Sequence, residues 1–474
     1  MKPEKMSDAI GELDEKIVEE ADNARTEKKR KISRKPLWIS IGAVAACAGI
    51  VGGIAMMNIP PVGVTAAAQA VYPEMAQYPD EMSLSFEADY DKWWNDRKAQ
   101  RSDVMGYADN LWDFYGDSTN TFLSGSEENR VYSPLNVYMA LAMLAETTTG
   151  DSRQQILDLL SAEDIEALRS QAGKLWNANY CNDGAITSIM GNSVWLDDCL
   201  DYDQNTLNRL AESYYASSYS GNFGSEEMNT QLRNWLNDQT GGLLKNAVDE
   251  VELTPDMVLA LYSTVLFKGK WDSQFNAAKN DQKAFHAPGG DIETEFMNKT
   301  QQLNYYWGED FGAVFLNFSS GCDMMLILPD EDKSIDDVLN SGEYMKFVQN
   351  PYEQENQKFL NVNYSVPKFD VSSTIILNEG LKTLGISDVF SPEAGDFSIL
   401  NGDNSGIYVS KVNHSARVKI DEEGCEAAAF TEISYVGASM PPDDEIDFVL
   451  DRPFIFVIRG MDGQPLFVGT VYNP

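Results

Sequence analysis

The chain has 474 residues, with 74 Asp and Glu against 36 Lys and Arg, and a formal net charge of −38 at pH 7. Such a charge repels phosphate backbones, which excludes nucleic acid as a partner. The length allows one large domain or two to three ordinary ones. The only histidines are His286 and His414, which is too few to suggest a zinc site or a His-based hydrolase. We therefore expect no metal and no cofactor.

No motif of a familiar enzyme class is present. The chain has no GxxxxGK[ST] loop and no GxGxxG, and its nearest match to a nucleophile elbow, GASMP at 437–441, ends in Pro rather than Gly. We predict that the protein is not an enzyme. We also expect free, buried thiols, with a Cys181–Cys199 bridge as the alternative. The cysteines are Cys47, Cys181, Cys199, Cys322 and Cys425.

The N-terminal region predicts a membrane anchor. Residues 1–36 are charged and end in a basic cluster, and residues 37–57 carry no charge. At 1.5 Å per residue this apolar run spans about 30 Å, the hydrocarbon thickness of a bilayer. It is longer than the apolar core of most cleaved signal peptides. We predict an uncleaved, single-pass signal-anchor at 37–57, with the basic segment 1–36 in the cytoplasm and the rest outside the cell.

Residues 58–100 predict an extracellular linker. Turn-forming and small residues dominate its first part, NIPPVGVTAAAQAVYPEM, and show little periodicity. Without structure, such a segment has a root-mean-square span of about 35 Å. Its aromatic patch YDKWWNDR, residues 90–97, instead favours a helix lying on the domain that follows.

Residues 101–474 predict one α+β domain. Stretches such as 108–123 and 134–148 show the i, i+3, i+4 apolar spacing of helices. Strand-like runs, among them 256–267 and 454–460, accumulate later in the chain. This mixed order favours an α+β fold over regular βαβ repeats.

Several motifs of this domain follow one another as they do in a known family. They are VYSPLNVYMALAMLAETTTGDSRQQIL, NSVWL, LYSTVLFKGKWDSQF, VPKFDVSSTIILNEGLKTLGISDVF, DRPFIFVIRG and FVGTVYNP. In this respect the domain resembles the serpins and looks like a membrane-anchored member of prokaryotic type. The resemblance implies three β-sheets, eight or nine helices, an exposed reactive-centre loop, a monomeric state and inhibition of serine or cysteine proteases.

The stretch DEEGCEAAAF, residues 421–430, is similar to the hinge of the serpin reactive-centre loop. In the family, a protease cleaves this loop, and the segment before the cut inserts into the main sheet and carries the bound protease with it. Because strand side chains alternate, Cys425 and Ala427 are expected to face inward. The hinge residues implied by the resemblance are Glu422, Glu423, Gly424, Cys425, Glu426, Ala427, Ala428 and Ala429.

Family spacing places the reactive bond about fourteen residues after Gly424, at Ala438–Ser439, with Val436–Gly437 as the alternative. Alanine before the bond suits a protease with a small, apolar specificity pocket, of the elastase or subtilisin kind. We therefore expect such a protease as the partner.

The resemblance also implies a polar latch, called the shutter, below the middle of the sheet. Its expected residues are Ser133, Asn136, Ser263 and His414, with one Ser and one Asn exchanged relative to the family, and with Asn136 and His414 in hydrogen-bonding reach. At the breach, the top of the sheet, the expected residues are Trp271, Lys368 and Glu422. Two other functions stay open: a non-inhibitory surface or adhesion protein on the same scaffold, and a surface-anchored hydrolase.

Overall fold

The computed structural model describes most of the chain after the predicted anchor. The described residues are 63–79, 83–102, 106–242, 251–319, 321–402, 407–425 and 444–474. The predicted anchor at 37–57 lies outside them. None of the helices in the described ranges is long and apolar enough to span a bilayer.

The described residues contain eleven α-helices, more than the eight or nine expected, because α3 precedes the domain and α14 has only four residues. The helices are α3 Phe86–Ser102, α4 Trp112–Leu123, α5 Pro134–Thr147, α6 Gly150–Leu159, α7 Ile165–Asn179, α8 Gln204–Ser213, α9 Glu226–Gln239, α11 Ile335–Ser341, α12 Glu343–Gln349, α13 Asn378–Thr383 and α14 Ser398–Asn401.

The strands confirm an α+β fold. They are β1 Val64–Ala68, β2 Arg130–Tyr132, β3 Cys181–Asn182, β4 Thr187–Asp197, β5 Ala216–Gly221, β6 Leu259–Lys270, β7 Asp281–Ala287, β8 Gly290–Trp307, β9 Phe311–Asn317, β10 Asp323–Pro329, β11 Gln357–Pro367, β12 Phe369–Ile376, β13 Asn413–Ile420, β14 Gly424–Cys425, β15 Glu445–Val449, β16 Phe454–Arg459 and β17 Pro465–Val471.

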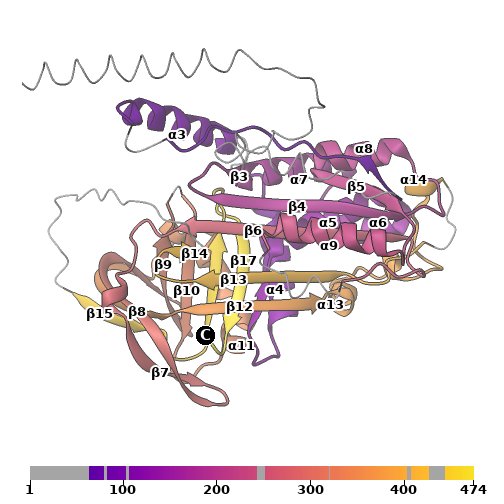
Figure 1. The fold of residues 1–474 in the computed structure, drawn as a ribbon. Coiled ribbons are helices and arrows are strands. Elements are labelled where there is room, and N and C mark those ends of the chain that lie inside the picture. The colour runs from indigo at the N-terminus through magenta and orange to yellow at the C-terminus, as the bar shows by residue number, and fades with distance from the viewer. Residues whose placement is uncertain are drawn as a thin grey trace, which may run out of the picture. The chain divides into compact units, whose positions relative to one another are not determined.

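An eight-stranded sheet contains the site. Its order is β1-β5-β4-β6-β14-β13-β12, with β3 paired to β4, and Figure 1 shows its long strands side by side. β4 is buried along nearly its whole length, which explains its continuous run of apolar and small residues. Helix α5 is buried at 13 of its 14 positions, so it forms part of the core beneath the sheet.

The other strands form a nine-stranded sheet, with eight strands in the path β15-β11-β8-β9-β10-β16-β17-β2 and β7 paired to β8 beside it. The 18-residue strand β8 pairs with β7 and β11 along most of its length and with β9 only at Tyr305, Tyr306 and Trp307. The path therefore consists of two sub-sheets joined at one end of β8. The three sheets implied by the resemblance correspond to this divided path together with the eight-stranded sheet.

The segment expected to be a linker is packed on the domain wherever it is described. β1 pairs antiparallel with β5 and becomes an edge of the eight-stranded sheet. In α3, Trp93 and Arg97 lie one helical turn apart and are 2% and 3% exposed, and the Trp93 indole donates to the Asp183 carboxylate at 3.0 Å. The helix expected over residues 90–97 is confirmed. The expectation of an unstructured linker is wrong for the described residues, because this segment has its own apolar contacts with the domain.

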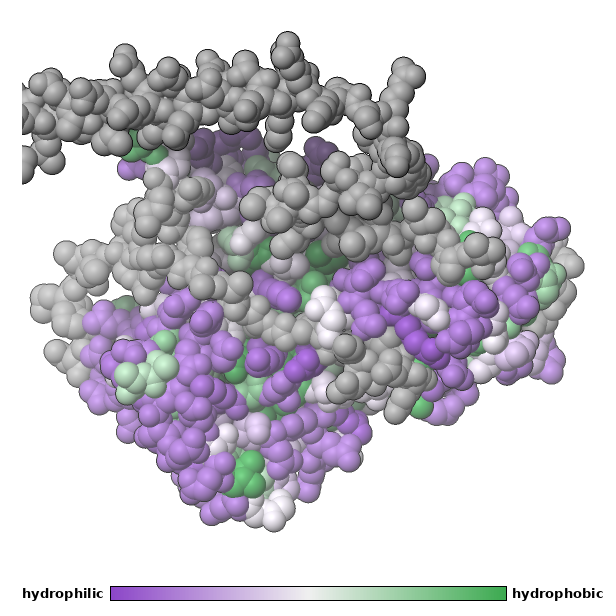
Figure 2. Space-filling view, in the orientation of Figure 1, coloured by the Kyte–Doolittle hydropathy of each residue, from purple (hydrophilic) through white to green (hydrophobic). Residues whose placement is uncertain are grey.

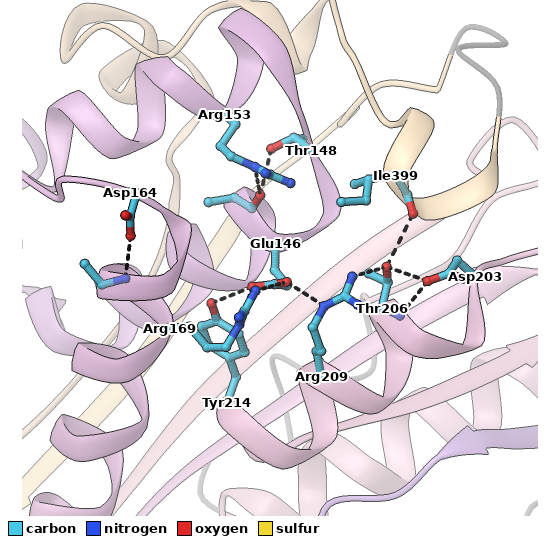
Figure 3. A network of polar contacts seen from close by, with 12 residues as sticks. Glu146, Thr148, Arg153, Asp164, Arg169, Asp203, Thr206, Arg209, Tyr214 and Ile399 are labelled. Atoms are coloured by element: carbon cyan, nitrogen blue, oxygen red, sulfur yellow. Dashed lines mark hydrogen bonds and ion pairs between the residues drawn. The ribbon is translucent and has the colours of Figure 1, made fainter.

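A buried charged network joins α5, α7 and α8 (Figure 3). The carboxylate of Glu146, 1% exposed, accepts hydrogen bonds from Arg169 at 2.8 and 3.1 Å, from Arg209 at 2.8 Å and from the Tyr214 hydroxyl at 3.1 Å. Burial acts to raise the pKa of Glu146, but these donors outweigh it and hold the pKa below its usual value. Glu146 is therefore ionised and ties the three helices together.

The hydropathy of the surface is consistent with the high net charge of the chain. The face in Figure 2 is mostly hydrophilic, and its hydrophobic residues lie in small, separate areas.

Candidate functional site

The start of the expected hinge is already a strand of the sheet. In β14, Gly424 pairs with Lys270 and Cys425 with Gly269 of β6, and Cys425 also pairs with Ile420 of β13. Cys425 is 2% exposed, so its side chain faces inward as expected. The hinge residues Glu426, Ala427, Ala428 and Ala429 and the expected bond Ala438–Ser439 lie outside the described residues.

Gly424 is required by the close approach of β14 to β6. Its φ is +149°, and a Cβ at this position would lie 2.2 Å from the carbonyl oxygen of Gly269. Only glycine has both the conformation and the space for this approach. The strand therefore begins at a fixed residue, with Cys425 as its first side chain inside the sheet.

The expected breach residues meet around the turn before β14. The Trp271 indole donates to the Asp421 carbonyl at 2.9 Å, and the Trp271 backbone N–H donates to the Glu423 carbonyl at 3.0 Å. The Lys368 ammonium lies 2.7 Å from the Glu422 carboxylate and 3.0 Å from that of Glu295. The turn is thus held from both sides by backbone and charged contacts.

This ion pair shifts the pKa values of both partners. Partial burial acts to raise the pKa of Glu422, but hydrogen bonds from Lys368, the backbone and Asn280 lower it below its usual value. The pKa of Lys368 is raised, because its bonds to Glu422 and Glu295 outweigh its desolvation. Both groups are therefore charged at neutral pH.

The expected shutter residues converge at the start of α5, with one difference. Ser133 caps α5, and its Oγ accepts the Asn136 backbone N–H at 3.3 Å. The Ser133 backbone N–H donates to Nε2 of His414 at 3.0 Å. The Ser263 hydroxyl contacts the side-chain oxygen of Asn136.

We expected Asn136 and His414 to lie within hydrogen-bonding reach; in the described residues the donor to His414 is the Ser133 backbone N–H, and no direct bond from Asn136 is found. Ser133 is the N-cap of α5, so its backbone N–H has no partner within the helix and is available to the imidazole. Asn136 and His414 are instead connected through Ser133, whose Oγ and N–H serve one residue each.

His414 is a neutral acceptor in this network. It is 3% exposed, and its ring packs edge-on against Tyr132 with 5.4 Å between centroids. Burial lowers the pKa of His414 to about 4, because removal from water disfavours the charged form of the ring. With Nε2 accepting a hydrogen bond, the proton of the neutral ring lies on Nδ1.

Asn192 belongs to the same network and is not among the residues expected from the sequence. It lies opposite Ser263 across β4 and β6, with its side-chain oxygen 2.7 Å from the Ser263 hydroxyl. Its amide also donates to the Tyr214 carbonyl at 2.8 Å. The sequence feature that could have indicated Asn192 is the asparagine of NSVWL, because a polar residue inside a buried strand needs a hydrogen-bond partner.

The remaining sequence candidates carry no chemistry. Cys181 and Cys199 are both free thiols, so the alternative of a Cys181–Cys199 bridge is wrong. His286 is exposed and pairs with Asp291 at 2.8 Å, on a different sheet from His414. The described residues contain no group of His, Cys, Asp and Glu arranged to hold a metal ion.

Comparison with known proteins gives one family. The family profile described as serpin (serine protease inhibitor) matches residues 113–474, more than half of the chain. Serpin-ZX of Arabidopsis thaliana is 28% identical over 368 residues, which cover 73% of this chain and 92% of the relative. A protein of Cyanea capillata named serine protease inhibitor is 28% identical over 372 residues, covering 75% of this chain and 95% of the relative.

Comparison with solved structures gives the same family. The thermophilic serpin tengpin in its native state has a TM-score of 0.69 and 26% identity, covering 87% of this chain and 100% of that one. The chain belongs to the serpin family.

Proposed function

We propose that this serpin inhibits serine or cysteine proteases as a suicide substrate. After cleavage, the loop would insert between β6 and β13 and carry the acylated protease with it. The observation that carries the proposal is β14: Gly424 and Cys425 already form the first two residues of that strand.

The path ahead of β14 supports insertion. Among the described strands, β6 and β13 form no ladder with each other, and β14 is the only strand between them. Farther along, an opening of about 260 Å³ lies between the ends of the same two strands. It is lined by Leu259, Leu261 and Tyr262 on one side and by Ser410, Lys411 and Asn413 on the other. Insertion would add backbone hydrogen bonds to both neighbouring strands.

The proposed reactive bond is Ala438–Ser439, and the proposed target has a small, apolar specificity pocket. The support is the spacing from Gly424 and the absence of Lys and Arg from SYVGASMPP. The name of the Cyanea capillata relative supports the inhibitory class but does not indicate the pocket.

The test is incubation with an elastase-like and a trypsin-like protease, followed by a denaturing gel. We expect a covalent complex with the elastase-like enzyme and none with the trypsin-like one. Loop cleavage without any covalent complex, and without a rise in thermal stability after cleavage, would favour the non-inhibitory scaffold instead.

We further propose that residues 37–57 anchor the protein in the cell membrane, with the serpin domain outside. The support is the uncharged run and the basic cluster before it. Protease added to intact cells should digest the domain and spare a tag at the N-terminus. Recovery of full-length protein in the soluble fraction would contradict the anchor.

A further inference from the structure

The chain joins the eight-stranded sheet at the end opposite the hinge. Val64, at the start of β1, pairs with Gly221 of β5, and Gly221 pairs with Asp197 at the end of β4. Beside Asp197, Leu196 pairs with Leu259, the first residue of β6. We call this the β1 end of the sheet.

The hinge end is defined by β14. Cys425 pairs with Gly269, near the last residue of β6. Leu259 and Gly269 are ten residues apart on one strand, which corresponds to about 33 Å at 3.3 Å per residue. The place where the chain joins the sheet is therefore separated from the hinge by about the length of β6.

The link between the anchor and β1 is short. Residues 58–62 separate the apolar run from Gly63. Six Cα steps of about 3.5 Å give a reach of at most about 20 Å. With 37–57 in the bilayer, β1 keeps its end of the sheet within that distance of the lipid surface, unless β1 leaves the sheet.

We propose that the β1 end of the eight-stranded sheet faces the membrane, and that β1 is a strap that unpairs when a trapped protease arrives there. The inference rests on the proposed inhibitory function and on the proposed anchor. It adds an orientation of the domain on the lipid surface and a moving part that neither of them requires.

The register shows why the strap must move. If the loop continues β14 in register, each further residue pairs one step back along β6, so residue 435 lies opposite Leu259. Ala438, bound to the protease, would then lie just beyond the β1 end. A protease domain of about 230 residues has a radius of gyration near 17 Å and a diameter of about 45 Å. It does not fit into a gap of about 20 Å.

Release of β1 would remove this conflict. β1 has five residues, pairs with β5 alone among the described strands, and exposes Thr65 at the sheet edge. Its other contacts are few: Val64 packs in a core cluster, and the Gln204 amide donates to the Ala67 carbonyl at 3.0 Å.

Helix α3 is held elsewhere, by Trp93 on Asp183 and by Gln100 on the carbonyl of Tyr180. The segment between β1 and α3 is also held, because the Ala70 N–H donates to Ser217 Oγ at 3.2 Å and the Tyr78 N–H donates to the Asp183 carbonyl at 2.8 Å. With these contacts and α3 in place and β1 released, the twelve Cα steps from Met57 to Gln69 reach up to about 42 Å, close to the diameter of the protease.

The orientation can be measured without any protease. Cys199 is an exposed thiol whose backbone N–H bonds to Asp197 at the β1 end. A donor dye on Cys199 of the full chain in liposomes should transfer energy to acceptor-labelled headgroups several-fold better than a dye on Ala278→Cys in a Cys199→Ser background. Ala278 is exposed on the segment that follows Phe275, whose N–H bonds to Glu422 at the hinge end. Equal or reversed transfer would overturn the orientation.

The strap is tested by a disulfide lock. Thr65 and Ser220 are direct partners across β1 and β5, so Thr65→Cys with Ser220→Cys in the Cys199→Ser background places two thiols at bonding distance. In liposomes, the oxidised full chain should give at least tenfold less covalent complex than the reduced chain, with cleaved loop instead.

A longer link provides the matched control. Twenty Gly/Ser residues inserted between Pro61 and Val62 should restore the complex in the oxidised lock, because the β1 end then has room for the protease. Equal trapping by the oxidised and reduced chains would overturn the strap. Failure of the insertion to restore trapping would also overturn it, since the lock would then act on the sheet itself. Absence of complex with the reduced, unlengthened chain would instead count against the proposed inhibitory function.

Discussion

Helix α5 carries a polar network at each end, and the two networks differ in charge. At its start, Ser133 and Asn136 contact His414 and Ser263, all of them neutral groups. At its end, Glu146 is ionised and bound by two arginines. One network bridges the strands that would separate in the proposed insertion, and the other joins helices.

The neutral network at the start of α5 is suited to a region that opens, and the charged network at its end is suited to a region that stays fixed. Leaving a neutral buried group without its partner costs about 1–3 kcal/mol. Leaving a buried charge without its partner costs about 3–5 kcal/mol. The proposed opening between β6 and β13 would therefore have a moderate cost, while α5, α7 and α8 remain together.

The largest effect is expected at the charged end. Glu146→Gln would leave Arg169 and Arg209 without a carboxylate, so the first unfolding transition in denaturant should lose about 3 kcal/mol, the low end of the range because these side chains are 25% and 31% exposed. The control is Glu212→Gln, on the exposed side of α8, which should change stability by less than about 0.5 kcal/mol. If both variants unfold like the parent, the charged network does not fix the helices.

A charge placed in the neutral region tests the other half of the comparison. Cys425→Arg would bury an unpaired charge at the first inserted position, at a penalty of several kcal/mol. Because each 1.4 kcal/mol on a barrier is about tenfold in rate, insertion should slow by about a hundredfold or more. A denaturing gel should then show cleaved inhibitor and free protease instead of complex.

Cys425→Thr is the matched control for this variant, because Thr is close to Cys in size and carries no charge. It should trap protease like the parent. If Cys425→Arg trapped protease equally well, inhibition would not depend on β14.

A smaller effect is expected from the latch. His414→Ala would leave the Ser133 N–H without an acceptor, a cost of about 1–3 kcal/mol. The sheet should open more easily, and size-exclusion chromatography after mild heating should show more polymer or self-inserted monomer. His286→Ala is the control, because His286 is exposed on β7. Unchanged heating behaviour of His414→Ala would show that the latch does not hold the sheet closed.

The sequence predicted the residues of the hinge and latch better than their bonds. The spacing of DEEGC and the Ser-Pro start of α5 are local features, so Cys425 and Ser133 could be placed from the sequence. The partner of His414 depends on how β13 approaches α5, a contact 281 residues apart in the chain. Nothing in the local pattern distinguishes the backbone of Ser133 from the amide of Asn136 as its donor.

The N-terminal segment shows a second limit. Small residues and prolines in 58–79 are typical of a linker, yet β1 forms because β5 offers an unpaired edge. Strand formation of this kind is decided by the partner and not by intrinsic propensity. By contrast, the aromatic cluster of α3 carried its own signal and was predicted correctly.

The smallest effect concerns pH and follows from the buried imidazole. The folded pKa of His414 is about 4, below the ordinary value of about 6.5. Between these values the unfolded chain binds a proton and the folded chain does not, so this group contributes stability that is present above pH 6.5 and is lost as pH falls toward 4. From pH 7.5 to 5.5 the loss should be about 1.4 kcal/mol.

Carboxylates such as Glu422 also titrate at acid pH, so the measurement is the difference between the parent and His414→Gln in denaturant melts at both pH values. Gln keeps a polar group at the site and does not titrate, so the parent should lose about 1.4 kcal/mol more than the variant over this interval. Equal losses would mean that His414 is protonated in the folded state above pH 5.5, and that the latch is not the neutral network described by its contacts.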